Sequence, residues 1–143
     1  MSGVSYSATV LAAVASFVFG ALWYGALSRF WMQARGVTAA EMVVARKGMG
    51  AVPVPYVVAF LAELVMAWML AGLLLHLTQG GLAPGVRNGM ISAAFLWLGF
   101  VATTLVVNHT FQGAKHMLTL IDGGHWLGVL LLQGAILGSW GAR

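Results

Sequence analysis

The chain contains four stretches that are each long and apolar enough to cross a lipid bilayer as a helix. A membrane-spanning helix needs about 20 predominantly apolar residues. The four stretches are Ser7–Leu27, Tyr56–Leu77, Asn88–Phe111 and Asp122–Trp140. Only 7% of the residues are charged, whereas soluble domains carry about 25%. The sequence therefore predicts an all-α membrane protein, with residues 1–143 forming a single domain of four transmembrane helices.

Composition excludes several other classes of protein. The first apolar stretch lacks the basic region of a signal peptide and is too long for one, so we expect it to be retained as a helix. The chain has no cysteine, which excludes disulfides and thiol chemistry. Its seven basic residues are scattered rather than clustered. This distribution argues against nucleic-acid binding and favours contacts with lipid headgroups.

The longest connection, residues 28–54, contains a second type of helix signal. Thr38 and Glu41 have the spacing of a capping box, in which each side chain bonds to the other residue's backbone N–H. Apolar residues follow on one side, and Gly48 or Gly50 would end the helix. We predict a short amphipathic helix lying on the membrane surface. An ordinary polar loop is the alternative.

The distribution of basic residues predicts the orientation in the membrane. Cytoplasmic connections of membrane proteins are enriched in Lys and Arg close to the helix ends. The first and third connections hold five such residues, and the opposite side holds two. The five are Arg29, Arg35, Arg46, Lys47 and Lys115, and the two are Arg87 and Arg143. Both termini are therefore expected outside the cytoplasm.

Small residues recur every four positions along three of the predicted helices, and the chain has 19 glycines. Such rows allow helix backbones to approach closely in a membrane. The rows are Ala12–Ser16–Gly20, Ala59–Glu63–Ala67–Ala71, Gly124–Gly128 and Gly134–Gly138. They predict tight packing within one bundle, with a homo-oligomer interface as the alternative. Because four helices make a thin bundle, we expect a homo-oligomer or a subunit of a larger membrane complex.

One carboxylate interrupts the apolar run "AFLAELVMAWML" at residues 59–70. A charge at this depth costs about 2.5–3.5 kcal/mol on insertion scales, so Glu63 needs a partner, water or a proton. At 1.5 Å per residue, the cytoplasmic halves of the third and fourth helices reach the level of Glu63. The candidate site therefore consists of Glu63, Thr104, Asn108, His109, Asp122 and His125.

Three interpretations of this candidate site remain open. In the first, a protonated Glu63 hydrogen-bonds to Asn108 or Thr104, and Asp122 only caps the fourth helix. In the second, the site binds a proton, a cation or a small ligand while Glu63 changes its protonation. In the third, the histidines and carboxylates hold a metal or cofactor. The chain contains no recognised metal motif, and its residues identify no cofactor.

Motifs for nucleophilic hydrolysis, nucleotide binding and zinc proteolysis are absent from the sequence, which favours a protein without enzyme activity. The leading hypothesis is a binding or permeation protein that uses Glu63. The second is a structural or accessory subunit of a membrane complex. The third is a membrane-embedded glutathione- or lipid-modifying enzyme. That enzyme would need cationic residues near Glu63, and only Arg46 and Lys47 of the first connection are available.

Three segments carry a family resemblance. They are "GALWYG" at 20–25 followed by "FWM" at 30–32, "FLWLGFVATTLVVNHTFQG" at 95–113, and "GHWLGVLLLQGAILGSW" at 124–140. In their order and spacing, these segments resemble the DUF1761 family of small bacterial membrane proteins. The resemblance implies four helices with a longer first connection, in the bacterial cytoplasmic (inner) membrane. It implies no particular activity.

Overall fold

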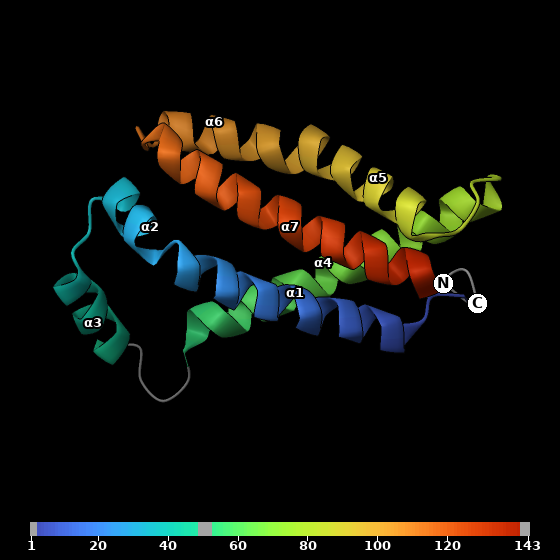
Figure 1. Ribbon diagram of the computed structural model, residues 1–143, viewed down its shortest axis with the longest axis horizontal. Coiled ribbons are helices and arrows are strands. Elements are labelled where there is room, and N and C mark those ends of the chain that lie inside the picture. Colours follow the sequence, from blue (N-terminus) through green and yellow to red (C-terminus); the bar gives the residue numbers. More distant parts are fainter. Residues whose placement is uncertain (1–2, 49–52, 141–143) are drawn as a thin grey trace.

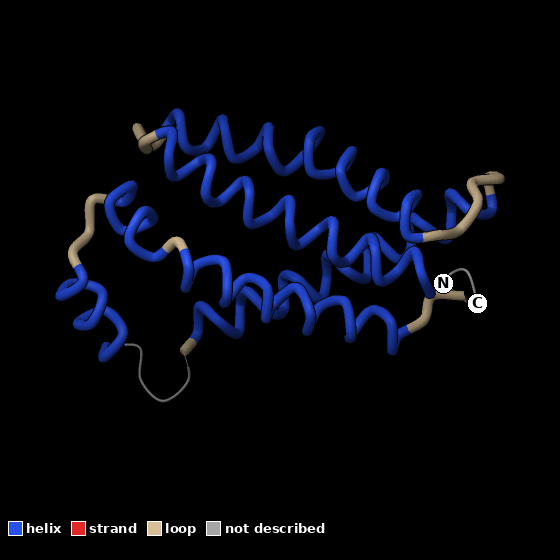
Figure 2. Tube along the Cα trace, viewed as in Figure 1, coloured by secondary structure: helices blue, strands red, loops and turns tan. Residues whose placement is uncertain are grey.

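The computed structural model describes residues 3–48 and 53–140, and the regular structure of these residues is entirely helical (Figures 1 and 2). The elements are α1 (Tyr6–Ala26), α2 (Ser28–Arg35), α3 (Ala39–Gly48), α4 (Val54–Gln79), α5 (Val86–Leu96), the π-helix η1 (Trp97–Ala102), α6 (Thr103–Phe111) and α7 (His116–Trp140). The elements α5, η1 and α6 follow one another without a break and form the third span, Val86–Phe111. Together with α1, α4 and α7, this gives four helices long and apolar enough to cross a membrane, which confirms the predicted all-helical fold and is compatible with a membrane protein.

The start of the fourth long helix differs from the prediction. The turn after α6 is short, because Gly113 adopts a left-handed conformation with φ of 64°. The backbone N–H groups of Gly113 and Ala114 donate to the carbonyls of Thr110 and His109 and close this turn. As a result, α7 already begins at His116. The prediction that Asp122 caps this helix is wrong, because Asp122 lies inside it.

The first connection contains one helix that was predicted and one that was not. The capping box of α3 is present: the Thr38 N–H donates to Glu41 Oε2 over 2.6 Å, and the Glu41 N–H donates to Thr38 Oγ1 over 3.3 Å. Helix α2 was not predicted, and it ends at a left-handed Gly36. Helix α3 lies away from the four long helices (Figure 1). Gly50 and Arg143, which entered the predictions above, lie outside the described residues.

The capping box makes the stability of α3 depend on pH. Hydrogen bonds from the backbone N–H and hydroxyl of Thr38 lower the pKa of Glu41. A lowered pKa means that the stabilisation is complete above the usual Glu value of about 4.3. It is lost as the pH falls through the lower value of the folded state. We expect amide-exchange protection of α3 to fall in this acidic range. Thr38→Ala should weaken the protection at neutral pH and reduce this pH dependence, because it removes the hydroxyl but keeps the backbone N–H that donates to Glu41.

Helix α7 occupies the centre of the bundle, between the third span and the α1–α4 pair (Figure 1). Glycines allow it to cross α5 at very short range. A Cβ atom on Gly134 would lie 2.5 Å from the carbonyl oxygen of Gly89, and one on Gly138 would lie 2.5 Å from that of Gly85. The predicted close approach at the Gly134–Gly138 row is therefore confirmed, and the row is used within the chain.

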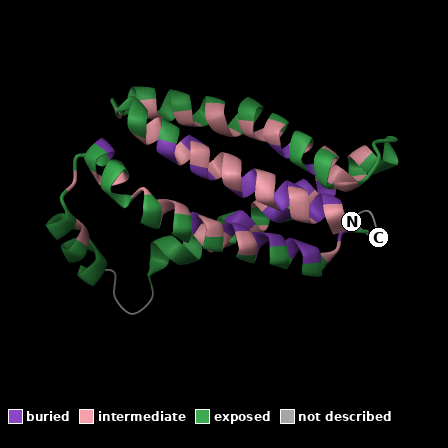
Figure 3. Cartoon of the chain, in the orientation of Figure 1, coloured by how far each residue is buried: buried purple, intermediate pink, exposed green. Residues whose placement is uncertain are grey.

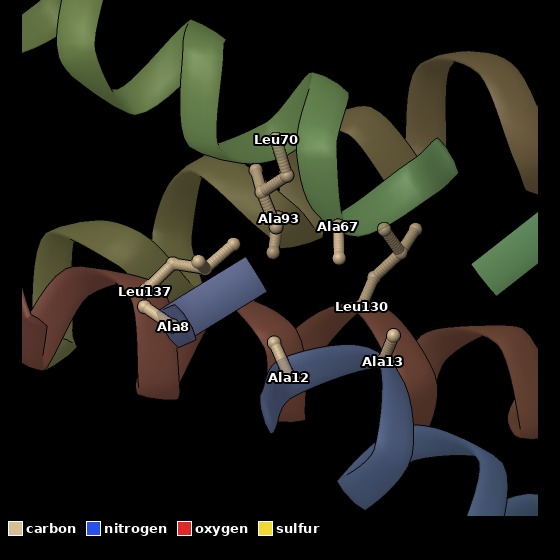
Figure 4. Close-up of a cluster of buried hydrophobic side chains, with 8 residues drawn as sticks. All are labelled: Ala8, Ala12, Ala13, Ala67, Leu70, Ala93, Leu130 and Leu137. Atoms are coloured by element: carbon tan, nitrogen blue, oxygen red, sulfur yellow. The ribbon is translucent and has the colours of Figure 1, made fainter. Parts of the chain in front are cut away.

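The interior is built mainly from small side chains contributed by α1, α4 and α7, where the buried residues concentrate (Figure 3). Figure 4 shows the buried apolar cluster, of which five of the eight members are alanines: Ala8, Ala12, Ala13, Ala67, Leu70, Ala93, Leu130 and Leu137. The predicted small-residue rows of α1 and α4 face this interior. By contrast, only 6% of the most apolar window of the third span is buried, so this span lies at the edge of the bundle.

Candidate functional site

Glu63 lies in the middle of the bundle, on the face of α4 that packs against α1. Its side chain is only 2% exposed. Ser16 of α1, which is fully buried, donates its hydroxyl proton to Glu63 Oε2 over 2.8 Å. The Ala12–Ser16–Gly20 row places a small residue here, and therefore α1 comes close enough for the short serine side chain to reach the carboxyl group.

Gln133 of α7 completes the group and links all three helices. Its side-chain amide Nε2 donates to Ser16 Oγ over 3.0 Å and to the backbone carbonyl of Glu63 over 3.1 Å. Gln133 is also fully buried. We call Ser16, Glu63 and Gln133 the central cluster. Each member comes from a different long helix, so the cluster is a tertiary feature rather than a local motif.

The single hydroxyl proton of Ser16 has two acceptors within reach. Glu63 Oε2 lies 2.8 Å from Ser16 Oγ, and the backbone carbonyl of Ala13 lies 3.1 Å from it. When Glu63 is ionised, Ser16 donates to the carboxylate. When Glu63 is protonated, the acid donates to Ser16, and Ser16 turns its own proton to Ala13. Both protonation states therefore keep their hydrogen bonds without moving a helix.

The charges around the central cluster favour the neutral acid. Within the described residues, the salt bridge joins His109 to Asp122, and no cationic nitrogen lies within 4.0 Å of Glu63. An unpaired charge in a dry interior is strongly unfavourable. A hydroxyl and an amide can orient an acid by hydrogen bonding, but they supply no compensating charge. The cluster is thus suited to hold a proton on Glu63.

The predicted hydrogen-bond partners of Glu63 were wrong. Thr104 and Asn108 are exposed on the outer side of the third span, and they form no hydrogen bond to Glu63 in the described part of the chain. The physical reason is the order of the helices in space. At this level the third span packs against α7, and α7 itself packs against α1 and α4.

Asp122 and His109 do meet, as predicted, but in a separate group nearer to the α2–α3 end of the bundle. The Tyr24 hydroxyl donates to Asp122 Oδ1 over 2.9 Å, and His109 Nε2 lies 3.8 Å from Asp122 Oδ2. The other ring nitrogen of His109 is 3.0 Å from Thr119 Oγ1. This group ties the start of α7 to α1 and α6, and it does not include Glu63.

His125 lies between these two groups and is only 5% exposed. Its ring packs 4.8 Å from the Tyr24 ring and 4.8 Å from the Trp126 ring, measured between centroids. Its Nε2 faces Gly20, where a Cβ atom would lie only 2.7 Å away. Within the described residues its Nδ1 has no hydrogen-bond partner. There, the His, Asp and Glu side chains form no group of three or more that could hold a metal ion.

The model of the family with the description "Protein of unknown function (DUF1761)" matches residues 7–138. The chain belongs to the DUF1761 family. This confirms the resemblance seen in its segments. No curated protein and no solved structure matches the chain. In this DUF1761 protein, the geometry of the central cluster is therefore the feature that bears on function.

Sequence reasoning missed two of the three residues of the central cluster in this DUF1761 protein. Ser16 was recognised only as part of a packing row, and Gln133 was not among the candidate residues. The available signal was depth: Ser16 is at the middle of α1, and Gln133 is the polar residue at the matching level of α7. Combining depth with the interior-facing rows would have paired these residues with Glu63.

The Tyr24–Asp122 hydrogen bond makes a measurable contribution to stability. Tyr24→Phe removes the hydroxyl donor and leaves a carboxylate oxygen of Asp122 without its partner. We expect the free energy of unfolding to fall by about 1–2 kcal/mol. The measurement is denaturant unfolding in mixed micelles. Tyr56→Phe is the matched control, since Tyr56 is 47% exposed, and it should change stability by less than about 0.5 kcal/mol.

Proposed function

We propose that this DUF1761 protein is a multi-pass protein of the bacterial cytoplasmic membrane in which Glu63 binds and releases a proton during proton or small-cation permeation. The observation that carries the proposal is the geometry around Ser16. This hydroxyl can serve either the carboxylate or the carboxylic acid form of Glu63. A carboxyl group that keeps its hydrogen bond to Ser16 in both forms can change its charge without unfolding the bundle.

The proposal includes an orientation. The connections at the α2–α3 end carry most of the basic residues, which supports a cytoplasmic location for this end. Both termini then lie outside the cytoplasm. Helix α3 has no buried residue within the chain. With apolar residues along one side and Arg46 and Lys47 in its last turn, it suits the headgroup layer of the membrane.

Proton flux into liposomes tests the proposed function. The purified chain is reconstituted, a pH gradient is applied, and flux is followed with an enclosed pH-sensitive dye. Glu63→Gln should lower the flux by at least about tenfold, the rate change for a barrier raised by about 1.4 kcal/mol. Glu41→Gln is the matched control because Glu41 is an exposed carboxylate on α3. An unchanged flux in Glu63→Gln would rule out the proposal.

A second candidate function is that of a subunit in a homo-oligomer or a larger membrane complex. The observation that favours it is Asn108, which is exposed on the third span and has no side-chain hydrogen bond among the described residues. An unpaired amide on an apolar helix favours association through hydrogen bonds to another helix. Native mass spectrometry after mild extraction tests this. Asn108→Leu should release the associated chain. A wild-type protein that is monomeric after mild extraction would contradict this second candidate function.

A further inference from the structure

The two halves of the bundle on either side of the central cluster are packed very differently. Towards the α2–α3 end, aromatic rings fill the interface between α1 and α7. Phe19 lies 5.7 Å from Trp23 and 6.3 Å from His125, measured between ring centroids. Tyr24 and Trp126 flank His125 on its other sides. We call these five residues the aromatic layer.

Glycines opposite these rings show how completely the aromatic layer is filled. A Cβ atom on Gly124 would lie 2.8 Å from Cζ2 of Trp23, and one on Gly128 would collide with the ring of Phe19. In addition, the indole N–H of Trp23 donates to the carbonyl of Ile121 over 3.1 Å. The rings therefore occupy the space that the glycines leave, and they fill the interface between α1 and α7 in this half of the bundle.

The opposite half of the bundle contains a cavity. At the terminal end, where α1 begins and α7 ends, the structure contains a cavity of about 260 Å³. Its walls come from the first turns of α1 and α5 and the last turns of α4 and α7. Most of the lining is apolar, and Ser5, Thr78 and Asn88 contribute polar side chains. This cavity is large enough for several water molecules, each of which occupies about 30 Å³ in the liquid.

The cavity lies on the terminal side of the central cluster, and its walls include residues of the same three helices. Its lining includes Ala8 of α1, Ala71 of α4 and Leu137 of α7. Leu137 is one turn from Gln133, or about 6 Å along the axis. Ala8 and Ala71 are two turns from Ser16 and Glu63 respectively, or about 12 Å.

A layer of buried apolar side chains separates the cavity from Glu63 along α1 and α4. Ala12 and Ala67 are the intervening members of the two rows, and both are fully buried. Figure 4 shows their methyl groups pointing into the space between α1 and α4, with Leu70 and Leu130 beside them. This layer consists of aliphatic side chains, whereas the aromatic layer consists of rings. Because the cavity already reaches within one turn of Gln133, a small opening of the bundle would admit water from the cavity first.

The central cluster also has an acceptor ready for such a water molecule. Gln133 Oε1 is buried and has no hydrogen-bond partner among the described residues. Buried acceptors are generally satisfied by protein or by ordered water. The titratable side chains on the neighbouring faces of α1 and α7 are Tyr24, Asp122 and His125, and all three lie on the opposite side of the cluster from the cavity.

We propose that Glu63 exchanges its proton with water in the cavity at the terminal end, across the Ala12–Ala67 layer, while the aromatic layer closes the path to the other end. In this step a hydronium ion gives one proton to the Glu63 carboxylate and leaves as water, and the reverse step returns the proton. The proposal rests on the proposed function, since it requires a Glu63 that changes protonation. It adds the side of the membrane from which the proton comes.

A single cysteine tests this route, because the natural chain has none. Ala71→Cys is folded into lipid nanodiscs and then modified with a small, water-soluble methanethiosulfonate. The group attached to the cysteine therefore enters the cavity only after the protein has folded. Infrared spectroscopy then follows hydrogen–deuterium exchange at the carbonyl band of protonated Glu63, assigned by its loss in Glu63→Gln. Arg87→Cys, modified in the same way, is the control: Arg87 is exposed near the terminal end and does not line the cavity.

The expected result is that Cys at position 71 reacts and that the modified protein exchanges at least about tenfold more slowly, the change for a barrier raised by about 1.4 kcal/mol. Modified Arg87→Cys should exchange at the unmodified rate. Two results would overturn the route alone: unchanged exchange in modified Ala71→Cys, or no reaction there while Arg87→Cys reacts. The absence of any Glu63 acid band would instead contradict the proposed function, and the route with it.

Discussion

Replacing Gly134 with valine should lower the free energy of unfolding by about 3 kcal/mol, at the upper end of the range for overpacked interiors. The reason is the backbone crossing of α7 and α5. A Cβ atom at this position would lie 2.5 Å from the Gly89 carbonyl oxygen and 2.9 Å from the Cβ of Ala93. Backbone atoms on both sides cannot rotate away, so the helices must separate. Denaturant unfolding in mixed micelles measures this loss.

Gly99→Ala is the matched control for the glycine prediction. Gly99 also lies inside a membrane-length helix, but a Cβ atom there would have nothing within 4 Å. Alanine is favoured over glycine in a helix by up to about 1 kcal/mol, so stability should stay the same or rise slightly. Equal losses at the two positions would show that the close crossing of α5 and α7 is not what stabilises the bundle.

The second large effect concerns the charge at position 63. Glu63→Lys should lower the free energy of unfolding by about 3 kcal/mol, because a lysine at this depth is charged and has no anionic partner. Glu63→Gln should change it by less than about 1 kcal/mol. The amide has nearly the shape of the neutral acid and can donate to Ser16 in its place. A large loss in Glu63→Gln would show that the cluster depends on an ionised carboxylate.

The four long helices could be predicted from the sequence because membrane-length apolar runs follow from the thickness of the bilayer alone. The rows of small residues also identified the interior faces correctly, including both sides of the α1–α4 contact. The capping box located α3 because its signal is local. Helix α2 was missed because its length is only 8 residues. Such a short segment carries too little periodicity to distinguish it from a loop.

The partners of Glu63 could not be predicted in the same way. Depth along each helix follows from the sequence, and so does the buried face. Which helices are neighbours does not, because it depends on how all the faces pack together. The prediction assumed that the third span lies beside α4. The glycines of α7 instead bring the third span onto α7, which leaves α1 and α7 beside Glu63. Thr104 and Asn108 therefore lie on the outside.

In the proposed function, Glu63 is a buried carboxyl group that carries a proton within the central cluster. Infrared difference spectroscopy of the wild type against Glu63→Gln, in lipid nanodiscs at neutral pH, is the decisive measurement of this protonation state. We predict a carboxylic acid carbonyl band that is present in the wild type and missing in Glu63→Gln, and that shifts in Ser16→Ala because the hydrogen-bond partner is lost. A difference spectrum with carboxylate bands alone would show that Glu63 is ionised and does not carry the proposed proton.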